Sequence, residues 1–172
     1  MKTTNRWSFF FWLCLLKFSA KIQAMRKGFD YVGIGIGAAI IRDGKLFLAK
    51  RGEKAKNERG NWETPGGGLE QWETMEETVK REFLEEYDAE IEIVEELIAK
   101  DHILRNEGQH WVAICFLARL VGNEPRIMEP EKCAEIGWFT LDEAEKLPLT
   151  IPAAVDVKKL RKMYPNGLPQ TI

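Results

Sequence analysis

Residues 67–73, Gly-Gly-Leu-Glu-Gln-Trp-Glu, are followed after seven residues by residues 81–89, Arg-Glu-Phe-Leu-Glu-Glu-Tyr-Asp-Ala. The spacing of Glu82, Glu85 and Glu86 places all three carboxylates on one face of a helix. The glycines of the first segment allow the backbone of a preceding loop to approach that face closely. The two segments therefore predict a glycine-rich loop that leads into a helix with an acidic face.

The two ends of this helix carry recognisable signals. Thr74 and Glu77 fit the capping box Ser/Thr-x-x-Glu, so we expect the helix to begin after Thr74. The apolar pattern carries it to about Tyr87. Asp88 follows where a left-handed stop residue is expected, and Asp tolerates that conformation better than most residues.

Three carboxylates on one helical face repel each other unless a cation lies between them. Hard divalent cations take oxygen ligands, and Mg²⁺ prefers a few carboxylates together with water and substrate phosphates. Arg81 and Glu73 are placed to pair across the junction of loop and helix. The alternative reading of the same residues is a solvated acidic helix face, and the spacing alone leaves both open.

The full pattern resembles the Nudix box, Gly-x5-Glu-x7-Arg-Glu-U-x-Glu-Glu-x-Gly-U, where U is bulky and apolar. Asp88 replaces the late glycine of the box, and Ala89 is small for its last apolar position. The resemblance covers about residues 31–149, including Asn61–Gly67 before the box and Glu135–Phe139 after it. Seven of the nine specified positions match, namely Gly67, Glu73, Arg81, Glu82, Phe83, Glu85 and Glu86.

The resemblance implies an α+β fold, namely a Nudix-type α/β/α sandwich with a mixed central sheet and a catalytic loop-helix. It implies a hydrolase that cleaves a nucleoside diphosphate linked to another moiety. Mg²⁺ or Mn²⁺ would be held by Glu82, Glu85, Glu86 and the Gly66 carbonyl. Glu82 would also help to deprotonate the attacking water, and Arg81 and Glu73 complete the expected catalytic set.

Substrate contacts are expected from Arg51, Gly67 and Gly68, although Arg51 is equally readable as an exposed surface arginine. Residues 129–133 resemble a segment of MutT-like nucleoside triphosphate diphosphatases, in which a downstream acid completes the metal site. Glu131 is the candidate here, and its alternative is a surface loop acid.

The first expectation for function is hydrolysis of a nucleoside triphosphate, oxidised and non-standard ones included, to monophosphate and pyrophosphate. The second is hydrolysis of ADP-ribose or a nucleotide sugar. A rival of another class is a non-catalytic nucleotide-binding domain, and the complete set of three glutamates counts against it. A hydrolase of RNA caps ranks low because no basic surface interleaved with aromatic residues is evident.

Gly33, Gly35 and Gly37 alternate in a way that matches a dinucleotide fingerprint, Gly-x-Gly-x-x-Gly/Ala. That fingerprint must open a helix, whereas this segment continues as a strand into a hairpin turn at residues 43–44. Glycines at every second position more simply leave one face of a strand open, for close packing or for a flat ligand.

Trp111 is an aromatic residue that either stacks on a base or belongs to the core.

The remaining chain predicts strands and helices around this loop-helix unit. His102 and His110 are expected at strand ends or in solvent. Trp111–Leu120 is nearly continuously apolar, so we expect a central strand. Strands are expected at 31–41, 45–50, 62–68, 91–99, 111–120 and 136–140, and helices at 141–147 and 153–164.

With 172 residues, 45% of them hydrophobic, and a net charge of −2, the chain reads as one globular domain. This charge argues against binding to duplex nucleic acid through bulk positive charge. Residues 1–24 form an apolar extension, either signal-like or an upstream start artefact, and residues 25–172 the Nudix domain. We expect a cytoplasmic protein without stable membrane association, although the signal-like start keeps secretion open, and the oligomeric state stays open. Cys14, Cys115 and Cys133 are read as free thiols.

Overall fold

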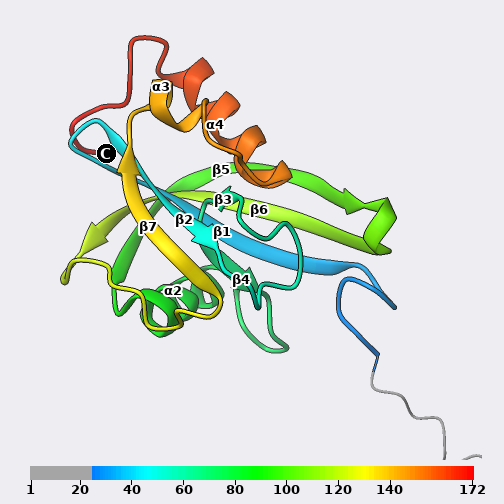
Figure 1. Ribbon diagram of the computed structural model, residues 1–172. Helices are drawn as coiled ribbons and strands as arrows, with labels where there is room; N and C mark the ends of the chain where they lie inside the picture. The colour runs from blue at the N-terminus through cyan, green and yellow to red at the C-terminus, as the bar shows by residue number, and fades with distance from the viewer. Residues whose placement is uncertain (1–24) are drawn as a thin grey trace, which may run out of the picture.

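The computed structural model describes residues 25–172; the expectations for residues 1–24, including Cys14, lie outside the described residues. A seven-stranded mixed sheet is flanked by helices (Figure 1). None of the described helices has the length and apolar character needed to cross a membrane. The elements are β1 Gly33–Arg42, β2 Lys45–Arg51, β3 Trp62–Glu63, β4 Gly66–Gly68, α2 Met75–Tyr87, β5 Glu90–Leu104, a 3-10 turn Arg105–Glu107, β6 Gln109–Val121, β7 Cys133–Phe139, α3 Leu141–Ala144 and α4 Ile151–Met163.

The main path of the sheet runs β3-β2-β1-β6-β5, with β4 paired to β1 and β7 paired to β2. The pair β1–β6 is parallel and the other pairs of named strands are antiparallel. Helix α2 covers one face, and α3 and α4 cover the other (Figure 1). This arrangement confirms the α/β/α sandwich, the central position of β6, and the strand reading of the alternating glycines.

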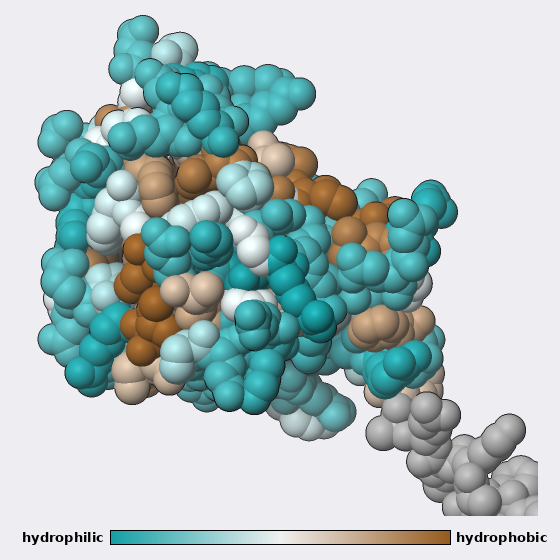
Figure 2. Space-filling model, viewed as in Figure 1, coloured by the Kyte–Doolittle hydropathy of each residue, from teal (hydrophilic) through white to brown (hydrophobic). Residues whose placement is uncertain are grey.

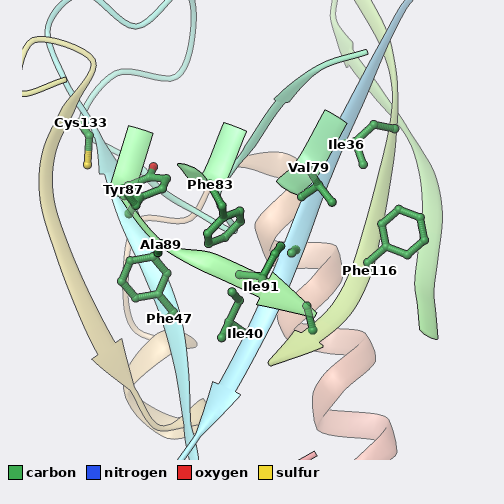
Figure 3. Packing of buried hydrophobic residues seen from close by; sticks show 13 residues of the cluster. Ile36, Ile40, Phe47, Val79, Phe83, Tyr87, Ala89, Ile91, Phe116 and Cys133 are labelled. Atoms are coloured by element: carbon green, nitrogen blue, oxygen red, sulfur yellow. The ribbon is translucent and has the colours of Figure 1, made fainter. Parts of the chain in front are cut away.

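Two buried clusters hold the three layers together. The first lies between the sheet and α2, where Phe83 and Tyr87 pack on Phe47 (Figure 3). The second lies between the sheet and α4, around Leu117 and Leu160. Along β1, even-numbered residues face α2 and odd-numbered residues face α4, because side chains alternate along a strand. The odd face therefore contains all three glycines of the alternating pattern.

Strand β5 pairs with β6 through two register shifts, one between Ile93 and Glu95 and one between Glu96 and Ile98. A single such shift turns the following side chains to the opposite face, and a second turns them back. Lys100 and His102 consequently face α4 and lie opposite Ala113 and Trp111 of β6. This strand was expected to end near residue 99, but it continues through Leu104 into a hairpin with β6.

The helix ends follow the capping signals with two differences. Helix α2 has both hydrogen bonds of the capping box at Thr74, and Asp88 is left-handed with φ 50°. The expected helix at 141–147 is a single turn, because only residues 141–144 are helical. The last helix begins at Ile151, two residues before the expected start, because the Thr150 side chain accepts a hydrogen bond from the Ala153 amide.

Candidate active site

The glycine-rich loop and the acidic face of α2 meet at Gly67 and Glu82. A Cβ added to Gly67 would lie 1.9 Å from Cδ of Glu82, so the Glu82 carboxyl packs directly on the Gly67 backbone. Gly66 is equally constrained, since its Cβ would lie 2.0 Å from the Ile36 carbonyl oxygen on β1. The pairing of β4 with β1 therefore requires glycine at position 66, whereas a side chain at position 67 would displace the Glu82 carboxyl from the loop.

Arg81 links the loop to the helix, as the spacing predicts. Its Nε donates to Glu73 Oε1 at 2.6 Å, and its Nη1 donates to Glu82 Oε1 and Glu85 Oε2 at 3.0 Å each. The hydrogen bonds from Arg81, with a further one from Thr78, hold the pKa of Glu73 at about 2. Glu73 is thus a permanent anion that orients Arg81.

Glu86 lies deeper than Glu85, and among residues 25–172 it forms no ion pair comparable to those of Arg81 with Glu82 and Glu85. Burial raises the pKa of Glu86 to about 7, and the carboxylates of Glu82, Glu63 and Glu129 add to the shift. Burial also raises the pKa of Glu82, an effect that Arg81 opposes. The surroundings of both carboxylates thus disfavour their ionised forms, and a bound cation would favour them.

This donor set fits a hard divalent cation, because carboxylate oxygens converge beside a glycine loop whose backbone approaches them closely. Among residues 25–172, no three His, Cys, Asp or Glu side chains form a ready-made cage. Arg81 occupies oxygens of Glu82 and Glu85, and Glu85 remains 58% exposed. To bind a cation, Glu82 and Glu85 would therefore have to give up some of their hydrogen bonds with Arg81.

An open cavity of about 530 Å³ lies beside the cluster, within the size range of ligand pockets. Gly66, Gly67, Gly68, Glu82 and Glu86 all line it, whereas Glu85 does not. Its lining combines acidic residues with basic ones, which suits a ligand that carries both phosphates and counter-cations. The basic lining residues are Lys27, Arg51, Lys54, Lys56, Lys100 and Lys132.

Arg51 lines the cavity, but its guanidinium is already engaged. Its Nη1 donates to Glu63 at 2.5 Å, and its Nε donates to the Asn57 carbonyl at 2.9 Å. Glu131 is not brought to the cluster: it pairs with Lys54 and is 65% exposed. The nearest acid from the segment 129–133 is Glu129, which adds to the pKa shift of Glu86.

The structure also brings together polar residues that the sequence analysis did not select. Lys100 donates to Asp156 of α4, and Thr64 donates to the other Asp156 oxygen at 2.8 Å. His102 lies near the end of β5, as expected, but it is not in solvent: it is 8% exposed, with Nε2 2.8 Å from a Glu58 oxygen. These pairs join residues that lie far apart in the sequence, so no local motif marks them.

Comparison with known proteins agrees with this geometry. A family model described as NUDIX domain matches residues 33–162, and the chain belongs to this family. A crystal structure of a MutT NUDIX hydrolase from Burkholderia pseudomallei is 38% identical, with a TM-score of 0.70 over 76% of this chain and 98% of the other.

Two curated relatives extend the comparison. A MutT-like protein from Streptomyces ambofaciens is 32% identical over 110 residues, which is 64% of each chain. The match thus spans just under two thirds of that relative. An ADP-ribose pyrophosphatase from Methanocaldococcus jannaschii is 30% identical over 131 residues, covering 76% of this chain and 72% of the relative.

Proposed function

We propose that the protein hydrolyses a nucleoside triphosphate to the monophosphate and pyrophosphate, with Mg²⁺ or Mn²⁺ as cofactor. The observation that carries this proposal is the pair Glu82 and Glu86. Both carboxylates line the same cavity, and one of them packs on the Gly67 backbone. Burial disfavours their ionised forms, and a divalent cation bound between them would favour those forms. Two carboxylates beside a glycine loop in a cavity of this size fit a cation that is bound together with nucleotide phosphates.

Glu82, Glu85, Glu86 and the carbonyl of Gly66 are the ligands we assign to the cation. When bound, it supplies positive charge that offsets the charge on the reacting phosphates. Glu82 accepts a proton from the attacking water, whose oxygen forms a new bond to phosphorus as the phosphoanhydride bond breaks. Arg81 holds Glu82 in place and is itself held by Glu73.

Basic side chains that line the same cavity provide contacts for the rest of the polyphosphate. Lys132 pairs with Glu129 and is 58% exposed, so its ammonium is accessible to a phosphate. Arg51 neutralises Glu63 beside the cluster. The resemblance of residues 129–133 to nucleoside triphosphate diphosphatases supports the triphosphate as the first choice.

ADP-ribose or a nucleotide sugar is the second candidate, because an ADP-ribose pyrophosphatase is among the relatives. A protein that only binds nucleotides would not need the Glu73–Arg81 hydrogen bonds, which orient the Glu82 carboxylate. An activity panel decides among the three. It contains the nucleoside triphosphates, ADP-ribose, nucleotide sugars and dinucleoside polyphosphates, with Mg²⁺ or Mn²⁺ and with EDTA, and products are identified by chromatography. Faster turnover of ADP-ribose than of every triphosphate would reverse the ranking, and no turnover of any compound would support the binding role.

A further inference from the structure

Residues 52–61, which we call the strap, connect β2 to β3 and form one wall of the cavity. Five of them line it, namely Lys54, Ala55, Lys56, Asn57 and Glu58. The side chains of the strap are mainly hydrophilic, as is most of the face of the molecule that Figure 2 shows. Within residues 25–172, no backbone–backbone hydrogen bond joins residues 55–59 to the chain outside the strap. The middle of the strap is therefore held to the protein through side-chain contacts.

Glu58 holds the middle of the strap at two points. Its Oε1 accepts a hydrogen bond of 2.8 Å from the backbone amide of Ile151, the first residue of α4. Its Oε2 lies 2.8 Å from Nε2 of His102 on β5, and this nitrogen has no other partner among residues 25–172. The Glu58 side chain is 9% exposed. One nearly buried carboxylate therefore joins the strap to a helix and to a strand that lie far from it in the sequence.

The backbone of Glu58 is left-handed, with φ 44°. A residue with a side chain adopts this conformation at a cost, and it persists where the surrounding contacts hold it in place. Glycine would adopt the same conformation without that cost. The local backbone thus gives no reason for a glutamate at this position, whereas the contacts of its carboxylate do.

The charge of Glu58 suits the positive end of α4. The amide of Ile151 is one of the first amides of the helix, which have no acceptor within the helix, and Glu58 provides that acceptor. Burial raises the pKa of Glu58, but the contact with His102, the hydrogen bond from the Ile151 amide and the nearby charge of Arg51 together outweigh burial. The pKa of Glu58 therefore lies below the usual 4.5, and the residue is an anion at neutral pH, as a helix N-terminus favours.

Asn57 links the position of the strap to Arg51. Arg51 Nε donates to the Asn57 carbonyl oxygen at 2.9 Å, and Arg51 Nη2 donates to Asn57 Oδ1 at 2.8 Å. Asn57 Nδ2 donates to Gln109 Oε1 of β6 at 3.0 Å. Because Asn57 directly precedes Glu58, release of Glu58 would also move the acceptors of Arg51. The strap thus orients a cation that lines the cavity.

We propose that Glu58 is a positioning residue: its carboxylate, through His102 and the first amide of α4, holds the strap in place as a wall of the cavity and so orients Arg51. The proposal rests on the proposed function, because it concerns binding of the substrate in the same cavity. Among the described residues, no hydrogen bond of the strap reaches α2, which carries the carboxylates of the proposed metal site. Loss of the Glu58 contacts should therefore weaken substrate binding and leave the chemical step largely intact.

Three variants of Glu58 test the proposal. Glu58→Ala and Glu58→Gly remove the carboxylate, and Glu58→Gly also removes the backbone strain, whereas Glu58→Gln keeps an acceptor oxygen without the charge. In each protein the ¹H–¹⁵N signal of the Ile151 amide reports its hydrogen bond. The rate of trypsin cleavage after Lys54, Lys56 and Arg59 reports release of the strap. Steady-state kinetics with the best substrate of the activity panel gives KM and kcat.

Glu58→Ala and Glu58→Gly should move the Ile151 amide proton upfield and raise the cleavage rate about tenfold or more, the scale of one hydrogen bond to a charged group. KM should rise about threefold to tenfold, the net scale of one hydrogen bond, while kcat changes by about twofold or less. Glu58→Gln should fall between these variants and wild type. Glu53→Ala is the matched control, because Glu53 is an exposed acid of the same strap, and all readouts should stay at the wild-type level.

Melting curves verify folding, and if Glu58→Ala does not fold, Glu58→Gly and Glu58→Gln give the same comparison. Wild-type behaviour of Glu58→Gly would attribute the role of this position to its backbone and would overturn the proposal. An unchanged Ile151 signal, faster cleavage without a rise in KM, or a fall in kcat at unchanged KM would also overturn it. Absence of hydrolysis by wild type would overturn the proposed function, while the amide signal and the cleavage rates would still decide whether Glu58 holds the strap.

Discussion

Arg81 Nε lies 2.6 Å from Glu73 Oε1, although Glu73 belongs to the loop and Arg81 to the middle of α2. The same guanidinium contacts Glu82 and Glu85. Arg81 therefore connects a fixed anion in the loop with two proposed metal ligands on the helix. Substitution of either residue should therefore alter both the position of the loop and the arrangement of the carboxylates of Glu82 and Glu85.

Glu73→Gln is expected to alter the dependence of stability on pH. The pKa of Glu73 is lowered from 4.5 to about 2, so its contribution is present above about pH 4.5 and is lost as pH falls toward 2. The melting temperature of wild type should exceed that of Glu73→Gln near neutral pH, and the difference should shrink across this interval. Gln71→Asn in the same loop is the control. A difference that stays constant from pH 7 to pH 2 would contradict the role of the pair.

Glu85→Gln is expected to separate stability from function. It removes one charge from a repelling cluster but also one exposed contact with Arg81, and each effect is worth only about 0.2–0.5 kcal/mol. The metal-free melting temperature should therefore hardly change. Loss of a hard ligand should weaken Mg²⁺ binding and lower turnover by about 10² or more.

Melting curves with EDTA and with Mg²⁺ check this prediction beside one activity assay. Wild type should gain melting temperature with Mg²⁺, since a ligand of the folded state stabilises it, and Glu85→Gln should gain much less. Glu76→Gln is the matched control, because Glu76 is an exposed acid in the first turn of α2 that also pairs with a cation at i+4. An active Glu85→Gln protein with a full Mg²⁺ shift would remove Glu85 from the metal site.

Asp88→Gly is expected to stabilise the end of α2. Asp88 is left-handed with φ 50°, a conformation that glycine adopts without cost. The gain of about 0.5–1 kcal/mol is partly offset by loss of the exposed ion pair with Arg126. Asp88→Ala keeps the steric cost and loses the ion pair, so it should be less stable than wild type. Urea unfolding of the three proteins gives the order, and Ala above Gly would contradict it.

Asp156→Leu is expected to destabilise the protein strongly. Asp156 and Lys100 are 1% and 8% exposed, and removal of one partner leaves a buried charge at a cost of about 3–5 kcal/mol. Lys100→Met combined with Asp156→Leu should recover much of this loss, because no charge is then left unpaired. Free energies of unfolding from urea titrations test the cycle, and additive losses in the double variant would show that the pair is not coupled.

A chain that begins at Met25 is expected to fold and to show the activity of the full chain. It keeps Lys27, whose ammonium donates to the Leu69 carbonyl at 2.5 Å and to Glu70 at 3.0 Å. Lys27→Met within that chain should lower kcat/KM about tenfold or more, because the glycine loop loses its outer anchor. Lys27→Arg should retain more of the wild-type kcat/KM than Lys27→Met, because it keeps a cation at this position. An insoluble or inactive chain from Met25 beside an active full chain would contradict the prediction.

Local signals in the sequence predicted the loop-helix unit well. The capping box at Thr74 and the left-handed stop at Asp88 depend on neighbours within a few residues, and both are confirmed. The Glu73–Arg81 pair could be predicted for the same reason. Glu73 lies just before α2 and Arg81 lies in its second turn, so local geometry brings the two side chains together. The alternating glycines predicted a strand whose glycine face allows close packing or a flat ligand; β1 confirms the strand, and Trp111 and Pro65 pack closely on Gly33 and Gly37.

Contacts between residues that lie far apart in the sequence could not be predicted from such local signals. Lys100 and Asp156 are separated by 56 residues, and neither stands in a motif. Their meeting depends on the register of β5, which two shifts determine and which apolar alternation does not reveal. The burial of His102 could not be predicted for the same reason, since an isolated histidine near a turn gives no sign that a distant loop will cover it.

The two register shifts in β5 also bear on how this fold tolerates insertions and deletions. If the two extra residues were deleted and the ladder became regular, the later pairs would not change, and Lys100 would stay opposite Ala113. If the shifts were lost with every residue kept, Ile98 would instead lie opposite Ala113 and Lys100 opposite Trp111, by the pairing that holds before the shifts. Side chains beyond both shifts would keep their face of the sheet but would slide by two residues, roughly 7 Å. The shifts thus let β5 gain or lose residues at these two points without moving Lys100 or the core residues beyond them.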